Sequence, residues 1–227
     1  MSDFDGPAMR RFLELFADRL HERRDELTQL DSAIGDADHG INMDRGFSAA
    51  RAKLDEIDNA ELGGFAKGVG MTLISTVGGA SGPLYGTFFL RLATTFGDAA
   101  TATPDELGAA LRAGLDGVRQ RGKAELDDKT MVDAMSPAVD AYEAASGDGI
   151  GAALTAAATA AAATAGVLSA CGSAGGTPEA VKKVRSVPYT VRFMALGTNP
   201  WMLEQLERFN KEVGPGLRAF SSDRRMR

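Results

Sequence analysis

Cysteine, histidine and tryptophan are scarce in this sequence of 227 residues, which contains one Cys, two His and one Trp. Because Cys171 has no second cysteine to pair with, no internal disulfide bond can form. Long apolar runs are missing as well, and none approaches the roughly 20 residues that a membrane-spanning helix needs. The first residues, MSDFDG, lack the positive flank and the apolar segment of a signal peptide. We therefore expect a cytoplasmic protein with no membrane partner.

Positive charge is also in short supply, since the formal net charge is -6. No stripe of Lys and Arg stands ready to meet phosphates, and the terminal DRRMR is too short to supply one. This balance argues against a nucleic-acid partner. The length and a hydrophobic fraction of 44% fit a soluble globular protein, which we expect to form a single domain over residues 1–227.

The alternation of apolar and polar residues that marks a half-buried strand is not sustained in any window. Apolar residues return instead at three- and four-residue steps, which is the period of an amphipathic α-helix. The sequence therefore predicts an all-α protein. The expected helices run over Pro7–Leu30, Phe47–Ile57, Phe65–Leu73, Leu84–Leu92, Thr103–Val118 and Thr130–Tyr142.

The helix that begins near residue 103 carries a clear start signal. Thr103 is a favourable N-cap, Pro104 fits the first helical position and Glu106 completes a capping box. Two regions nearer the C-terminus differ from the others. Residues 151–166 are mostly alanine, which indicates either a closely packed helix or low-complexity drift. We expect a loop over residues 171–189 and a last amphipathic helix after Pro200.

Two familiar motifs are approached but not completed. Residues 117–124 read GVRQRGKA, in which Ala124 replaces the Ser or Thr of a P-loop, and a helix rather than a strand precedes them. Asp36 and Asp38 fit the start of an EF-hand loop, but Ile41 and Phe47 stand where its Gly and Glu are required. Neither template predicts a site here.

Residues 30–47, LDSAIGDADHGINMDRGF, concentrate carboxylates with no basic residue before Arg45. The simplest interpretation is a solvated turn between two helices, because turns favour Asp, Gly and Ser. The alternative is a metal site, in which Asp31 at a helix end converges with Asp36 and Asp38 in the following loop. Oxygen ligands without Cys favour a hard cation such as Mg²⁺, which shares its shell with phosphate oxygens. This pattern favours a bound nucleotide or phosphoester.

A second segment, residues 77–87, reads VGGASGPLYGT and leads into an apolar helix. Glycines leave backbone N–H groups accessible, so the helix N-terminus is suited to an anion such as a diphosphate. A tight corner between two helices is the other interpretation, because glycines build such corners too.

Together with DGVRQRGKAELDDKTMVDAM at residues 116–135, these segments resemble the nucleotide-binding L subunit of the dihydroxyacetone kinases. The resemblance covers about residues 1–170. It implies an antiparallel barrel of about eight amphipathic helices with ADP at one end. It also implies that two Mg²⁺ ions are held against the phosphates by Asp31, Asp36 and Asp38. The implied contacts to ADP are His39, Gly40, Ile41, Asn42, Gly79, Ala80 and Ser81 at the phosphates, and Gly122 and Met131 at the base.

By this resemblance the protein is a phosphotransferase subunit. It would relay a phosphoryl group from a phosphohistidine donor protein, through bound ADP, to dihydroxyacetone held on a partner kinase subunit. An ADP-binding regulatory module that docks on a transcription regulator is one alternative, and an inactive relative is another. The family's GRASYLGERS and DPGA segments, which cover the phosphates, are not found in residues 171–227, where the sequence has been replaced or has diverged.

Overall fold

The structure is a computed structural model that describes residues 3–32, 36–57, 60–128 and 130–173. These residues form seven α-helices, one short 3-10 helix and two strands of two residues each. The helices are α1 (Gly6–Ser32), α2 (His39–Ala52), α3 (Leu62–Thr76), α4 (Ser81–Phe96), α5 (Pro104–Gly122), α6 (Met131–Ala145) and α7 (Ile150–Ser173). The 3-10 helix η1 is Ser146–Asp148, and the strands are β1 (Phe4–Asp5) and β2 (Thr101–Ala102). The predicted all-α class is confirmed.

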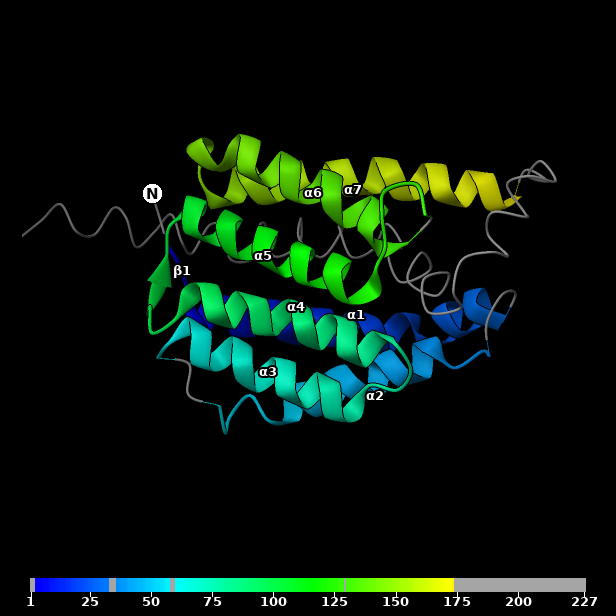
Figure 1. The fold of residues 1–227 in the computed structure, drawn as a ribbon. Coiled ribbons are helices and arrows are strands. Elements are labelled where there is room, and N and C mark those ends of the chain that lie inside the picture. The colour runs from blue at the N-terminus through cyan, green and yellow to red at the C-terminus, as the bar shows by residue number, and fades with distance from the viewer. Residues whose placement is uncertain (1–2, 33–35, 58–59, 129, 174–227) are drawn as a thin grey trace, which may run out of the picture.

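Consecutive helices run up and down and pack side by side, each against the next along the chain (Figure 1). The apolar faces predicted from the helical period meet in one core. Phe16 of α1 contacts Phe47 of α2 edge to face, with ring centroids 4.7 Å apart, and Phe47 contacts Tyr85 of α4 in the same way at 6.0 Å. At the opposite end from the predicted site, β1 pairs antiparallel with β2.

Most helix boundaries fall within a few residues of those expected. Thr103 caps α5 as predicted: its side chain accepts the N–H of Glu106, whose carboxylate accepts the N–H of Thr103. The helix expected over Phe47–Ile57 is the exception, because α2 begins at His39 and ends at Ala52. Beyond it the backbone tightens into turns, so Leu54 reaches the core from outside the helix.

The alanine-rich segment is a packed helix, α7, and not a structureless stretch. Among the side chains of α7 that the structure describes, the buried ones are Ile150, Ala153, Leu154, Ala157, Ala158 and Ala161. Because methyl side chains add little bulk, α7 approaches α6 closely. Residues 171–173, expected in a loop, are the last residues of α7. The rest of that loop and the helix expected after Pro200 lie outside the described residues.

No helix in the described part of the chain combines the length and the apolar character needed to cross a membrane. The incomplete P-loop segment is helical, since residues 117–122 form the end of α5. Lys123 then ends the helix in a left-handed conformation, with φ of 52°. The backbone there is not a phosphate-binding loop.

Candidate functional site

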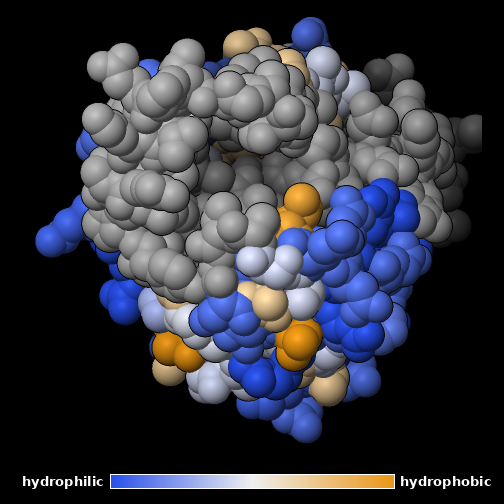
Figure 2. All heavy atoms as spheres, turned by 90° about the vertical axis from the view of Figure 1, so that its right-hand side faces the viewer, coloured by the Kyte–Doolittle hydropathy of each residue, from blue (hydrophilic) through white to orange (hydrophobic). Residues whose placement is uncertain are grey.

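All the site residues predicted from the sequence lie at one end of the helix bundle, on the right in Figure 1. In an up-and-down bundle every second connection falls at the same end. The α1–α2, α3–α4 and α5–α6 connections therefore meet there, although they are far apart in the sequence. Figure 2 shows this end face on: among the described residues, hydrophilic side chains cover most of the visible surface.

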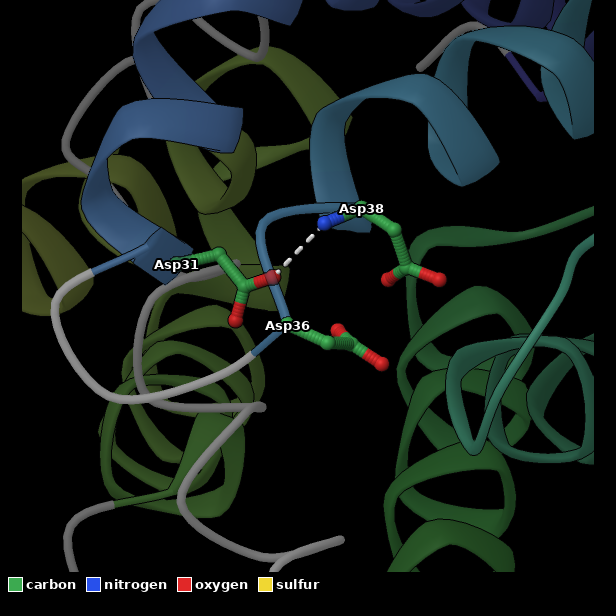
Figure 3. A group of neighbouring side chains, drawn as sticks. All are labelled: Asp31, Asp36 and Asp38. Carbon is green, nitrogen blue, oxygen red and sulfur yellow. Dashed lines mark hydrogen bonds between the residues drawn. The ribbon is translucent and has the colours of Figure 1, made fainter.

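The three predicted metal ligands converge (Figure 3). Asp31 lies in the last turn of α1, whereas Asp36 and Asp38 belong to the connection that leads into α2. One carboxylate oxygen from each lies within 4.8 Å of the others. Asp31 Oδ2 accepts the backbone N–H of Asp38 at 3.0 Å and that of His39 at 3.4 Å, so the first carboxylate fixes the backbone that carries the others.

Burial sets the electrostatics of this cluster. Asp31 is 0% exposed, and burial raises the pKa of its carboxyl, with the two backbone N–H donors opposing the rise and Asp36 and Asp38 adding to it. Burial also raises the pKa of Asp38, and hydrogen bonding with the Asn42 side chain opposes that rise. Asp31 Oδ1 is buried without a hydrogen-bond partner among the described residues. A buried, unsatisfied carboxylate oxygen beside two other carboxylates fits a hard divalent cation.

The first turn of α2 follows directly from the cluster. The first N–H groups of a helix have no acceptor within it. In α2 the N–H of Asn42 donates to the carbonyl oxygen of the N-cap, Asp38, at 2.9 Å. Ile41 is exposed, whereas Gly40 is buried against α1. A Cβ at Gly40 would lie 1.9 Å from Arg24 O, so only glycine allows the two helices to approach this closely.

His39 connects this turn to α4. Its ring is buried, and burial lowers its pKa to about 4, so the ring is neutral at pH 7. Nδ1 of His39 lies 3.4 Å from Oγ of Ser81, the first residue of α4. The sequence predicted both residues as ligand contacts, and the structure shows in addition that they contact each other.

The α3–α4 connection is a short turn through Val77–Ala80. Gly79 adopts a φ of +63°, which residues with a side chain rarely adopt, and nothing lies within 4 Å of the position that a Cβ would occupy. Ala80 is the N-cap of α4 and Ser81 is buried. The backbone therefore does form a tight turn between two helices. This turn also places the N-terminus of α4 at the same end of the bundle as the aspartate cluster.

The two predicted base contacts flank the α5–α6 connection. Gly122 is the last residue of α5, and Met131 is the first of α6 and is 1% exposed. Asp133 orders the connection by accepting the N–H of Asp127 at 2.6 Å and that of Thr130 at 2.8 Å. Thus both residues lie at the predicted end, with Met131 packed in the core. Their role at a base stays a prediction.

Sequence reasoning missed one side chain at this end. Arg45 of α2 donates to the amide oxygen of Asn42 at 2.7 Å and to the carbonyl oxygen of Thr76 at 3.1 Å. The spacing of three residues between Asn42 and Arg45 was the available signal, because such residues are neighbours on a helix surface. The contact with Thr76 depends on how α3 packs and carries no local signal.

Comparison with known proteins places these features in a family context. Residues 33–183 match the DAK2 domain. The chain is 52% identical over 120 residues to the ADP-binding subunit DhaL of the PEP-dependent dihydroxyacetone kinase of Escherichia coli (strain K12), covering 53% of this chain and 57% of that protein. It is 45% identical over 131 residues to the ADP-binding subunit DhaL of kinase 1 of Listeria innocua serovar 6a, covering 58% and 66%.

The fold has counterparts among solved structures. The dihydroxyacetone kinase of C. freundii in its native form matches with a TM-score of 0.66 at 22% identity, over 92% of this chain and 36% of that one. The same kinase in complex with AMP-PNP and Mg²⁺ matches with a TM-score of 0.63, over 89% and 33%. All these matches span less than two thirds of the relatives' own length.

Proposed function

Because the chain belongs to the DAK2 domain family, we propose that it binds ADP or ATP with Mg²⁺ and serves as the nucleotide-binding subunit of a dihydroxyacetone kinase. The observation that carries the proposal is the aspartate cluster. Three carboxylate oxygens lie within 4.8 Å of one another, and an oxygen of the buried Asp31 has no partner among the described residues. Carboxylates this close repel one another unless a cation joins them.

In this role Asp31, Asp36 and Asp38 would hold two Mg²⁺ ions, which would neutralise negative charge on the nucleotide phosphates. Asp31 is already in position for this task. Its carboxylate accepts hydrogen bonds from the backbone N–H groups of Asp38 and His39, which hold this segment in place before any ligand binds. A site fixed in advance loses little entropy on binding. That a C. freundii kinase of the same fold forms a complex with AMP-PNP and Mg²⁺ supports the assignment.

The phosphates are assigned to two helix N-termini. The first turn of α2, residues 39–42, and the Gly79–Ser81 start of α4 both belong to the aspartate end. N–H groups at a helix N-terminus and the helix dipole favour an anion. The neutral ring of His39, which contacts Ser81, acts here as a hydrogen-bonding group and not as a cation. Gly122 and Met131 complete the assignment on the side of the base.

The reaction we assign to the assembled enzyme is a relay. In it this chain would hold the nucleotide through the aspartate cluster and the two helix ends. The bound ADP would carry a phosphoryl group from a phosphohistidine donor protein to a hydroxyl of dihydroxyacetone held on a partner kinase subunit. Catalysis of phosphoryl transfer consists mainly of positioning and charge stabilisation. Both are properties of the cluster and of the helix ends. The names of the DhaL relatives support this assignment.

Isothermal titration of the purified protein with ADP tests the binding step. We expect binding in MgCl₂ and none in EDTA. Added phosphohistidine donor and dihydroxyacetone-bound subunit then test the relay, with formation of dihydroxyacetone phosphate as the readout. Absence of ADP binding in MgCl₂ would refute the proposal. Binding without transfer would favour the regulatory alternative instead.

A further inference from the structure

Arg45 joins two parts of the proposed site that belong to different helices. Its side chain leaves the second turn of α2 and donates from one terminal nitrogen to Asn42 Oδ1 at 2.7 Å. Its Nε donates to the carbonyl oxygen of Thr76, the last residue of α3, at 3.1 Å. The last carbonyl oxygens of a helix receive no hydrogen bond from N–H groups of the same helix. The helix dipole also favours a cation at this end. Arg45 therefore secures the end of α3 from which the Gly78–Gly79 turn departs.

The bond to Asn42 determines which way its amide points. A guanidinium group only donates hydrogen bonds, so the oxygen of the Asn42 amide must face Arg45. The NH₂ group is then the part of the amide left for Asp38, whose carbonyl oxygen accepts the backbone N–H of Asn42 at 2.9 Å. The Asn42 side chain also opposes the rise in the pKa of the Asp38 carboxyl, so it favours the charged form that binds a cation. Asn42 thus supports the charged Asp38 carboxylate, and its oxygen, which accepts a hydrogen bond from Arg45, is not available as a further metal ligand.

Packing keeps the amide in this place. Asn42 is 7% exposed, and a Cβ at Gly78 would lie 2.7 Å from its Oδ1. The Asn42 amide therefore packs directly against Gly78 and beside the guanidinium group of Arg45. A displacement of Arg45 would therefore shift both Asn42, next to the aspartate cluster, and Thr76, next to the glycine turn.

We infer that Arg45 is a positioning residue that sets the orientation of Asn42 toward Asp38 and the placement of the α3–α4 turn beside it. This inference rests on the proposed function, because it assigns Arg45 to the same metal and nucleotide site. Its two bonds go to the protein, so it acts through Asn42 and Thr76. Loss of a group that orients a metal ligand typically weakens metal binding by roughly tenfold to a hundredfold.

The test uses the full chain with Arg45→Ala, Arg45→Lys, Asn42→Ala and the double variant of Arg45→Ala with Asn42→Ala. Mn²⁺ affinity of the nucleotide-free protein is measured by electron paramagnetic resonance, and ADP affinity in MgCl₂ is measured by titration calorimetry. Arg51→Ala is the matched control. It removes the same charge from the same helix, but Arg51 pairs with Asp18 on α1.

We expect Arg45→Ala to weaken both affinities by about tenfold. Arg45→Lys should remain close to Arg45→Ala, because a lysine keeps the charge but cannot form the forked pair of bonds. For Mn²⁺ the double variant should bind no more weakly than Asn42→Ala alone, since Arg45 reaches the aspartate cluster through Asn42. For ADP the double variant should bind more weakly than Asn42→Ala, because the bond from Arg45 to Thr76 is lost as well. Arg51→Ala should bind like the wild type, and unchanged near-ultraviolet circular dichroism should show that each variant is folded.

Wild-type affinity in Arg45→Lys would overturn the inference, because charge alone would then explain the effect. Additive losses of Mn²⁺ affinity in the double variant would overturn it as well, since Arg45 would then act on the metal cluster independently of Asn42. A wild-type protein that binds Mn²⁺ but not ADP refutes the proposed function, and the Mn²⁺ series still decides the role of Arg45. A wild type that binds neither ligand overturns both.

Discussion

Asp31 is held in an environment unlike that of a surface aspartate. It is completely buried at the end of α1, where two backbone N–H groups donate to one of its oxygens. The other oxygen has no partner among the described residues. A buried carboxylate in this position destabilises the metal-free protein, because desolvation disfavours its charge. Binding of a divalent cation would relieve that cost, which couples metal binding to stability.

Removal of one carboxylate tests this coupling directly. In Asp38→Asn we expect Mg²⁺-dependent ADP affinity to fall by roughly a hundredfold or more, beyond the loss typical of groups that only orient a ligand. The unfolding temperature in EDTA should be equal or higher, since repulsion among the carboxylates is reduced. Calorimetric titration and thermal unfolding measure the two effects. Asp25→Asn is the control, because Asp25 lies on α1 with its side chain 87% exposed. Unchanged ADP affinity in Asp38→Asn would disprove the metal assignment.

The raised pKa of Asp31 makes a second prediction, about pH. Because the folded pKa lies above the ordinary value of 3.8, the folded state binds this proton more tightly than the unfolded chain does. The contribution of Asp31 to the free energy of unfolding is therefore full below pH 3.8 and is lost as the pH rises through the raised pKa. In EDTA, Asp31→Asn should gain stability relative to the wild type as the pH rises. Urea unfolding at a series of pH values measures this difference, and a constant difference would contradict the prediction.

At the scale of elements, the sequence predicts more of the helices than of their meeting points. The helical period located the helices, and the Thr103 cap located a boundary, because both signals are local. The end of α2 at Ala52 was not predictable, since apolar spacing continues to Ile57 without a glycine or proline to stop it. The close contact of Gly40 with Arg24 and the reach of Arg45 to α3 depend on tertiary packing, which no local pattern encodes.

The aspartate cluster was predictable for the opposite reason. Its three aspartates lie within eight residues of sequence, so the loop itself brings the carboxylates together. The burial of His39 and its contact with Ser81 were not predictable, because they join residues from α2 and α4. The local sequence thus predicted the cluster of carboxylates, whereas the contacts between helices around it depend on the fold. That these aspartates bind metal stays a prediction.

The α3–α4 turn carries a prediction of its own. In Gly79→Val a branched side chain would strain a backbone held at φ +63° and would stand where an anion approaches, so we expect ADP affinity to fall by at least about tenfold. Gly149→Val is a matched control. Gly149 also has a positive φ, of 98°, and open space around it, but it precedes α7 at the other end of the bundle. Both variants should lose stability, measured by urea unfolding, and only Gly79→Val should lose ADP. Equal ADP affinity in Gly79→Val and the wild type would mean that the turn only connects α3 to α4 and does not contribute to ADP binding.

At the scale of the whole molecule, the up-and-down order of the helices places three connections at the end that holds the aspartate cluster. A nucleotide bound there as proposed would lie near residues of α1, α2 and α4 and near the α5–α6 connection. The family resemblance adds a cover over the phosphates with an arginine in it. The sequence of residues 171–227 does not contain the motif that supplies this arginine.

This difference predicts weak retention of ADP. A charge-assisted hydrogen bond contributes about 1.5–3 kcal/mol, and each 1.4 kcal/mol is about tenfold in affinity. We therefore expect ADP to be held roughly tenfold to a hundredfold less tightly than by a relative that has the arginine. Gel filtration in MgCl₂, followed by chromatography of the nucleotide released on denaturation, measures retention. Stoichiometric ADP after prolonged dialysis would show that residues 171–227 close the site by other means.

The packing of each helix on the next also governs how fast the chain folds. Contacts between neighbours in sequence close short loops, so the helical part of the chain should fold rapidly for its length. The β1–β2 pair is different, because it pairs Phe4 with Ala102, which is far away in the sequence. The ring of Phe4 also stacks on that of Phe96, with ring centroids 6.5 Å apart. Such a distant contact is expected to form after the rate-limiting barrier. Phe4→Ala should then speed unfolding in stopped-flow experiments and leave the refolding rate nearly unchanged. Slower refolding of Phe4→Ala would instead show that the β1–β2 pair forms in the folding nucleus.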